Sequence, residues 1–173
     1  MFRILFLVAI VGGALMLAGC ARSKPSGETT SSRLPPQVNS SADVVRLGGF
    51  GAGVSQPASG TLEILIRVDE GYHVNANPAT FPYLIATELT AEKVEGIEVG
   101  KPIYPPAVKR KFQFAEEPLA VYEGNVNVSL PYVARTSGTK TLPISVRVQA
   151  CDQEKCFPPA TLKATPNITV GAK

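Results

Sequence analysis

Two cysteines separated by four residues, Cys151 and Cys156, are the residues of this 173-residue chain best placed to do chemistry. They stand where a strand-like apolar run ends, just before Pro158 and Pro159. An extended chain rises about 3.3 Å per residue, so a straight strand would keep them apart. A turn through residues 152–155 can bring their Cα atoms within the roughly 4.4–6.8 Å that a disulfide spans. The spacing therefore offers a small ring, stiffened at its exit by the two prolines.

Several kinds of chemistry fit such a pair. As a structural staple, a ring this small adds only about 2 kcal/mol in the chain-entropy model. Structural zinc needs four ligands, and besides the pair the chain offers one histidine, His73; two thiolates could still bind Cu(I). Nucleophilic hydrolysis needs a base that nothing in the sequence places at either thiol.

Thiol–disulfide exchange needs only an attacking and a resolving thiol, which one short ring supplies together. Lys155 favours the thiolate of its neighbour whereas Asp152 and Glu154 oppose it, so the sequence leaves the direction of any pKa shift open. We favour exchange without a metal or dissociable cofactor. The alternative is a non-catalytic β-sandwich protein of binding or assembly, in which the disulfide is structural.

The N-terminus indicates export. Residues 4–17 are uncharged and apolar but shorter than the about 20 residues that span a membrane, which is typical of a signal peptide. The sequence Leu-Ala-Gly-Cys at residues 17–20 resembles the bacterial lipobox, in which the cysteine becomes the lipidated first residue. We therefore expect cleavage after residue 19 and lipidation of Cys20, which leaves one cysteine pair in a disulfide-permissive compartment. Ala21 after the anchor favours the outer over the inner membrane of the cell envelope.

Composition indicates one domain behind a tether. Residues 20–43 are rich in Ser, Thr, Pro and Gly and predict a flexible tether, and residues 44–173 are long enough for a single core. Losing Arg3 with residues 1–19 lowers the formal charge from +3 to +2, too little to indicate nucleic-acid binding. The glycine-rich stretch 48–53 lacks the strand-then-helix setting of a phosphate loop, so we interpret it as a flexible connection.

Period-two alternation predicts an all-β domain. It is clearest in residues 61–68, 125–132 and 141–148, and shorter strands are expected near 72–75, 86–91, 96–99 and 160–170, the last broken at Pro166. No stretch of the mature chain shows helical periodicity. These short strands between Gly, Pro and Asn turns predict an immunoglobulin-like antiparallel β-sandwich.

The loop from Gln149 to Pro159 resembles the active-site loop of the N-terminal periplasmic domain of DsbD, the thiol:disulfide interchange protein. The similarity extends to residues 70–78 (EGYHVNANP), 112–114 (FQF) and 119–124 (LAVYEG), which with the loop cover most of residues 60–170. That family has an immunoglobulin-like fold, in agreement with the strand pattern.

The resemblance implies roles for individual residues. Cys156 would form the mixed disulfide with partners and Cys151 would resolve it. An aromatic ring, of Phe112 or of Phe114, would cap the cysteines until a partner docks. Side chains at three further positions would lie beside the site: Tyr72, His73 and Asn75.

The resemblance also implies partners, and the sequence departs from the best-known family form. The cysteines are four rather than five residues apart, and no transmembrane or thioredoxin-like domain follows within the 173 residues. We therefore expect a monomeric, lipid-anchored protein that faces the periplasm and acts as a component of protein-disulfide reduction. It would take electrons from a separate membrane thiol reductase or other thioredoxin-fold donor and pass them to a thioredoxin-fold acceptor.

Overall fold

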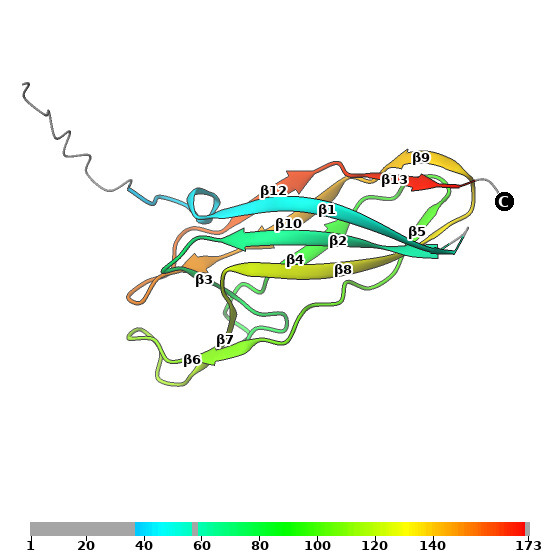
Figure 1. Ribbon diagram of the computed structural model, residues 1–173. Helices are drawn as coiled ribbons and strands as arrows, with labels where there is room; N and C mark the ends of the chain where they lie inside the picture. Colours follow the sequence, from blue (N-terminus) through cyan, green and yellow to red (C-terminus); the bar gives the residue numbers. More distant parts are fainter. Residues whose placement is uncertain (1–36, 57–58, 172–173) are drawn as a thin grey trace, which may run out of the picture. The chain divides into compact units, whose positions relative to one another are not determined.

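The computed structural model describes residues 37–56 and 59–171, and these residues form an antiparallel β fold (Figure 1). A 3₁₀ helix, η1 (Ser41–Asp43), precedes the strands. Thirteen strands follow in the described residues: β1 (Val45–Gln56), β2 (Ser59–Val68), β3 (His73–Asn75), β4 (Glu88–Ala91), β5 (Ile97–Val99), β6 (Val108–Arg110), β7 (Leu119–Tyr122), β8 (Asn125–Ala134), β9 (Gly138–Thr141), β10 (Ile144–Val148), β11 (Ala150–Cys151), β12 (Ala160–Ala164) and β13 (Asn167–Val170). The predicted all-β class is confirmed.

Two sheets pack face to face to make the sandwich. One has the strand order β1-β2-β8-β5 and the other β12-β10-β4, and β9 pairs with β13 near the C-terminal end (Figure 1). One buried cluster takes side chains from both sheets, including Ile64 of β2, Val128 of β8 and Val146 of β10. Burying each such side chain stabilises the fold by about 1.5–3 kcal/mol, so the core lies between the sheets.

The alternation of the three longest predicted strands is confirmed by burial. All twelve apolar residues on their predicted inner faces are buried: Leu62, Ile64, Ile66, Val68, Val126, Val128, Leu130, Tyr132, Leu142, Ile144, Val146 and Val148. Between them stand exposed residues such as Glu63, Arg67 and Arg147, because successive side chains of a strand point to opposite faces.

Two prolines divide strands that the alternation alone would join. The segment 141–148 is split at Leu142 and Pro143 into β9 and β10, and the last segment is split at Pro166 as expected. Proline has no N–H to donate, so a ladder is interrupted where it stands. The amide of Leu142 still donates to the carbonyl of Pro166, so the two breaks lie opposite one another.

The glycine-rich stretch 48–53 is not the flexible connection that its composition suggested. It lies within β1 and pairs residue by residue with β2, with an irregularity at Gly48. Ladder hydrogen bonds use only the backbone, so the missing side chains do not prevent pairing. A Cβ at Gly48 would lie 2.5 Å from Nε of Arg67, so a larger residue there would have to displace this exposed arginine side chain.

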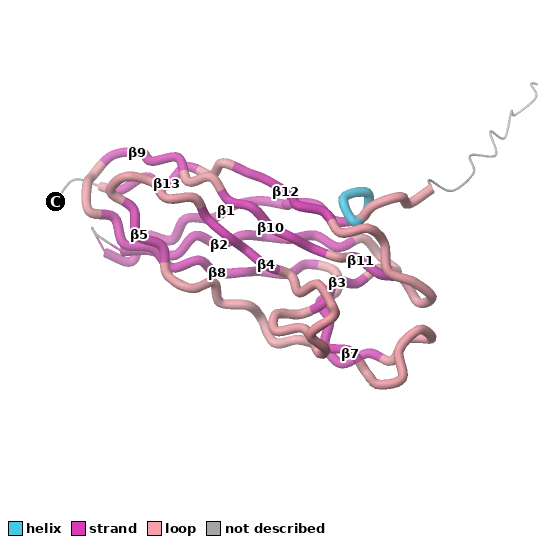
Figure 2. The backbone as a smooth tube through the Cα atoms, turned by 180° about the vertical axis from the view of Figure 1, so that it is seen from behind, coloured by secondary structure: helices cyan, strands magenta, loops and turns pink. Residues whose placement is uncertain are grey.

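A third, smaller sheet lies at one end of the sandwich and carries the cysteines. Its order is β11-β3-β7-β6. The loop that follows β11 and the loop between β6 and β7 project from this same end, as the view from behind shows (Figure 2). Strand β13 lies at the opposite end of the domain (Figure 1).

The folded unit begins earlier than residue 44. Ser40 caps η1, and Ser41 is fully buried against the domain, so residues 40–43 do not belong to a flexible tether. The rest of the expected tether, residues 20–36, and the expected signal peptide lie outside the described residues.

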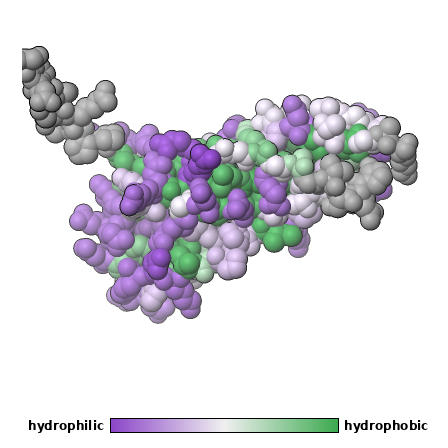
Figure 3. All heavy atoms as spheres, viewed as in Figure 1, coloured by the Kyte–Doolittle hydropathy of each residue, from purple (hydrophilic) through white to green (hydrophobic). Residues whose placement is uncertain are grey.

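On the face seen in Figure 3, apolar residues form small areas between polar ones. The described residues include no helix long and apolar enough to cross a bilayer.

Candidate functional site

The two cysteines are joined in a tight hairpin. Cys151 and Cys156 form a disulfide with their Cα atoms 3.9 Å apart, slightly less than the roughly 4.4–6.8 Å usual for disulfides. The hairpin is closed by the bond from the amide of Phe157 to the carbonyl of Ala150 at 2.8 Å. The predicted ring therefore exists, and it lies at the end of β11.

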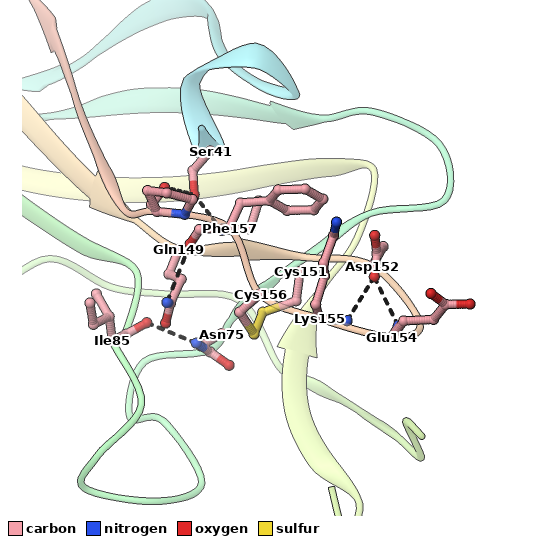
Figure 4. Close-up of a disulfide and its surroundings, with 12 residues drawn as sticks. Ser41, Asn75, Ile85, Gln149, Cys151, Asp152, Glu154, Lys155, Cys156 and Phe157 are labelled. Atoms are coloured by element: carbon pink, nitrogen blue, oxygen red, sulfur yellow. Dashed lines mark hydrogen bonds between the residues drawn. A yellow bond between two sulfur atoms is a disulfide. The ribbon is translucent and has the colours of Figure 1, made fainter. Parts of the chain in front are cut away.

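Asp152 builds the turn of this hairpin. Its Oδ1 accepts hydrogen bonds from the amides of Glu154 and Lys155, both at 2.8 Å, and its own amide donates to the carbonyl of Lys155 at 2.9 Å (Figure 4). A short acidic side chain that binds backbone amides two and three residues on is typical of tight turns. The sequence presented Asp152 only as a charge near a thiol, whereas in the structure it shapes the loop.

The two cysteines are not equally exposed. Cys151 is completely buried, whereas Cys156 is partly exposed. Lys155 extends over the ring of Phe157, with Nζ 5.5 Å from the ring centre, and both flank Cys156 in the sequence. A molecule that approaches the hairpin from solvent therefore meets Cys156 first.

Strand β3 places the predicted neighbours of the cysteines. It lies between β11 and β7, and His73 stands directly opposite Cys151 in the antiparallel ladder. Asn75, two residues further, points to the same face as His73. Tyr72 packs on Phe157, with ring centres 5.8 Å apart. All three predicted positions therefore lie at the hairpin.

The segment between β6 and β7 covers His73 with aromatic rings. Phe112 stacks on the imidazole of His73 with ring centres 3.8 Å apart, and Phe114 stacks on Phe112 at 5.5 Å. Phe112 is buried and packs with Leu119, whereas Phe114 is 38% exposed. Phe112 is therefore a packed ring of the domain, and Phe114 is the outer ring.

A backbone contact joins this aromatic segment to the cysteine hairpin. The amide of Gln113 donates to the carbonyl of Gln153 at 3.2 Å. Gln153 is at the tip of the hairpin and borders two shallow depressions, one lined by the aromatic segment and the other by residues 68–73 with Glu123. A backbone hydrogen bond thus joins the two loops at an open surface.

His73 is neutral at physiological pH. Burial lowers its pKa from the usual 6.5 to about 4, although the negative charges of Glu123 and Asp152 oppose the shift. The carboxylate of Glu123 is itself paired with Arg110, which lowers the pKa of Glu123. The group opposite Cys151 is therefore an uncharged imidazole.

Ser41 supports the base of the hairpin, and no sequence pattern indicated this role. Its hydroxyl accepts a hydrogen bond from the amide of Ala150 and donates one to the carbonyl of Pro158, both at 2.8 Å (Figure 4). The amide of Ser41 also donates to Pro158 at 3.0 Å. One side chain thus joins the segments of chain on either side of the disulfide.

Asn75 belongs to a buried polar network. The side-chain Nδ2 of Asn75 donates to the carbonyl of Ile85 at 3.0 Å, and the backbone carbonyl of Asn75 accepts from the hydroxyl of Thr87 at 2.7 Å. These bonds fix the loop between β3 and β4 against β3. Among the described residues, no cluster of three or more His, Cys, Asp and Glu side chains is arranged to hold a metal ion. Cys20 lies outside the described residues.

Comparison with family models decides the family. Residues 50–167 match the model described as thiol:disulfide interchange protein DsbD, N-terminal. The chain belongs to this family. The matched DsbD N-terminal region contains the hairpin, β3 and the aromatic segment, and it associates the chain with thiol–disulfide interchange. A search of curated protein sequences found no match.

One solved structure shares the fold at low sequence identity, and two others are similar with TM-scores below 0.5. The N-terminal periplasmic domain of ScsB from Proteus mirabilis has a TM-score of 0.52 and 11% identity, over 74% of this chain and 47% of that one. The reduced DsbD N-terminal domain of Neisseria meningitidis has a TM-score of 0.46 and 15% sequence identity, over 79% of this chain and 91% of that one. A chain from the complex of the DsbD and PilB N-terminal domains of Neisseria meningitidis has a TM-score of 0.49 and 14% sequence identity, over 78% of this chain and 87% of that one.

Proposed function

We propose that the chain relays reducing equivalents between thioredoxin-fold proteins through the Cys151–Cys156 disulfide. The observation that carries the proposal is the unequal burial of the pair: Cys156 is partly exposed and Cys151 is completely buried. Exchange requires an attacked sulfur that a partner can reach and a second sulfur that leaves and later resolves. Family membership supports the same chemistry.

The reductive half of the relay begins at Cys156. A thiolate of the donor attacks Sγ of Cys156, a new S–S bond forms, and the electron pair of the Cys151–Cys156 bond goes to Sγ of Cys151, which takes a proton. The second thiol of the donor then attacks the mixed disulfide and releases Cys156. The donor leaves as a disulfide and this chain holds two thiols. The oxidative half runs these steps in reverse with an acceptor disulfide.

The aromatic segment would act as a cap in this scheme. Phe114 is the outer ring. A docking partner would have to break or use the backbone hydrogen bond between Gln113 and Gln153. A precedent for a protein partner exists in the family, because the DsbD N-terminal domain of Neisseria meningitidis forms a complex with the PilB N-terminal domain. We further propose that Cys20 is lipidated and that the domain faces the periplasm.

Trapping tests the proposal. Cys151→Ala leaves Cys156 without its resolving thiol, so this variant should accumulate a mixed disulfide with an oxidised thioredoxin-fold protein, visible by non-reducing electrophoresis. With Cys20→Ser in both variants, the matched control, Cys156→Ala, retains only the buried Cys151 and should trap nothing. Equal trapping by both variants, or by neither, would contradict the proposal. A reduction potential below about −300 mV would instead indicate a structural disulfide.

A further inference from the structure

Two buried polar atoms beside the disulfide lack hydrogen-bond partners among the described residues. They are Nε2 of His73 and Oδ1 of Asn75, both on β3, and both residues are at least 98% buried. The third such atom is the hydroxyl of Tyr132, which stands on β8 opposite Gly60 and Val99, in a different sheet. A buried polar atom without a partner is costly, and folded proteins keep few of them.

His73 and Asn75 lie beside the cysteines, on one face of β3. His73 is the cross-strand neighbour of Cys151, and Asn75 is the diagonal neighbour on the same face. Figure 4 shows the carboxamide of Asn75 beside the disulfide, with its nitrogen held by the carbonyl of Ile85. That hydrogen bond fixes the orientation of the carboxamide, and the carboxamide oxygen, Oδ1, is the atom that has no hydrogen-bond partner.

Reduction of the disulfide changes what these atoms meet. The sulfurs of a disulfide carry no hydrogen, whereas each thiol can donate one hydrogen bond and accept another. The Asn75 oxygen can accept from a thiol. His73 can either donate to a thiol or accept from one, depending on which ring nitrogen carries its proton.

We propose that Asn75 and His73 are positioning residues for the reduced state, in which their unpartnered atoms bind the thiols of Cys151 and Cys156. The inference rests on the proposed exchange function. In the disulfide form the two atoms are unsatisfied, and in the dithiol form they are paired. They therefore favour reduction and make the pair a better electron acceptor than the same ring would be without them.

The test is the equilibrium with glutathione, in which two glutathione thiols reduce the disulfide and form one glutathione disulfide. All variants carry Cys20→Ser, so that Cys151 and Cys156 are the only cysteines that can react with glutathione. Asn75→Leu and His73→Phe keep the size of each side chain. Each should lower the equilibrium constant for reduction about tenfold, equal to about 30 mV. Tyr132→Phe removes the unpartnered atom that lies in the other sheet and should leave the constant within about twofold.

Outcomes separate cleanly. A fall in one variant beyond the Tyr132→Phe value supports the role of that residue, and unchanged constants in both variants overturn the proposal. Because Asn75→Leu also loses the bond to Ile85 and could fail to fold, the unsubstituted pair gives a second measurement. Its S–H infrared band should lie at lower frequency than that of free glutathione, and a band at the free-thiol frequency overturns the proposal. Failure to trap a partner would count against the proposed function but leave these measurements intact.

Discussion

Ser41→Ala should weaken the cysteine hairpin without touching a cysteine. The substitution removes the hydroxyl that accepts from the amide of Ala150 and donates to the carbonyl of Pro158. Ala150 is completely buried, so its amide would be left without a partner. Leaving a buried donor unpaired costs about 1–3 kcal/mol. Pro158 keeps the bond from the amide of Ser41, so we expect the total loss of unfolding free energy to stay in that range.

Urea unfolding with an unchanged m-value measures the loss, and amide hydrogen exchange at Ala150 locates it. The matched control is Ser40→Ala, which removes only the cap of η1 through the amide of Ala42 and should cost about 0.5–1 kcal/mol. Exchange at Ala150 should accelerate in Ser41→Ala and not in the control. Equal losses in both variants, with exchange at Ala150 unchanged, would refute the idea that Ser41 supports the hairpin.

Three further predictions follow from the site. Because burial holds the pKa of His73 at about 4, the unfolded chain binds more protons than the folded chain below pH 6.5. The free energy of unfolding should therefore fall by up to about 3 kcal/mol as the pH drops from 6.5 to 4. Urea unfolding of His73→Phe at both pH values should lack this part of the fall. Phe114→Ala should speed reduction of the disulfide by dithiothreitol at little cost in stability, whereas Phe112→Ala should destabilise by about 3–5 kcal/mol because that ring is buried; equal stability losses would contradict this assignment. Asp152→Ala should loosen the turn and cost about 1–3 kcal/mol, and Asp152→Asn, which keeps an acceptor oxygen, should recover most of it in thermal unfolding.

The sandwich could be predicted from the sequence because two of its long strands, β2 and β8, alternate without error. The inner faces of residues 61–68 and 125–132 are apolar at every second position, and that pattern fixes both strand and orientation. The strand over 48–53 could not be predicted, because glycines carry no side-chain pattern and pairing there depends on the neighbouring strand β2. The break at Pro143 was missed because the apolar alternation continues through it.

The site was predictable as far as local sequence reached. Cys151, Cys156 and the positions on β3 were expected from spacing and resemblance, and they do lie together. The choice between Phe112 and Phe114 needed burial, which a three-residue motif cannot give. Ser41 is 109 residues from Ala150, and an isolated serine in a polar segment has no periodicity to mark it. The unpartnered atoms of β3 likewise exist only in three dimensions.

The position of η1 has a mechanical consequence. The chain enters the domain through Ser41, and Ser41 is bonded to both strands of the hairpin. Tension applied to the N-terminal end would therefore be transmitted to the backbone on either side of the disulfide before it reached the sandwich. A fragment cut to begin at Val44 would retain every strand but would lose this link, so its redox behaviour would not represent that of the whole chain.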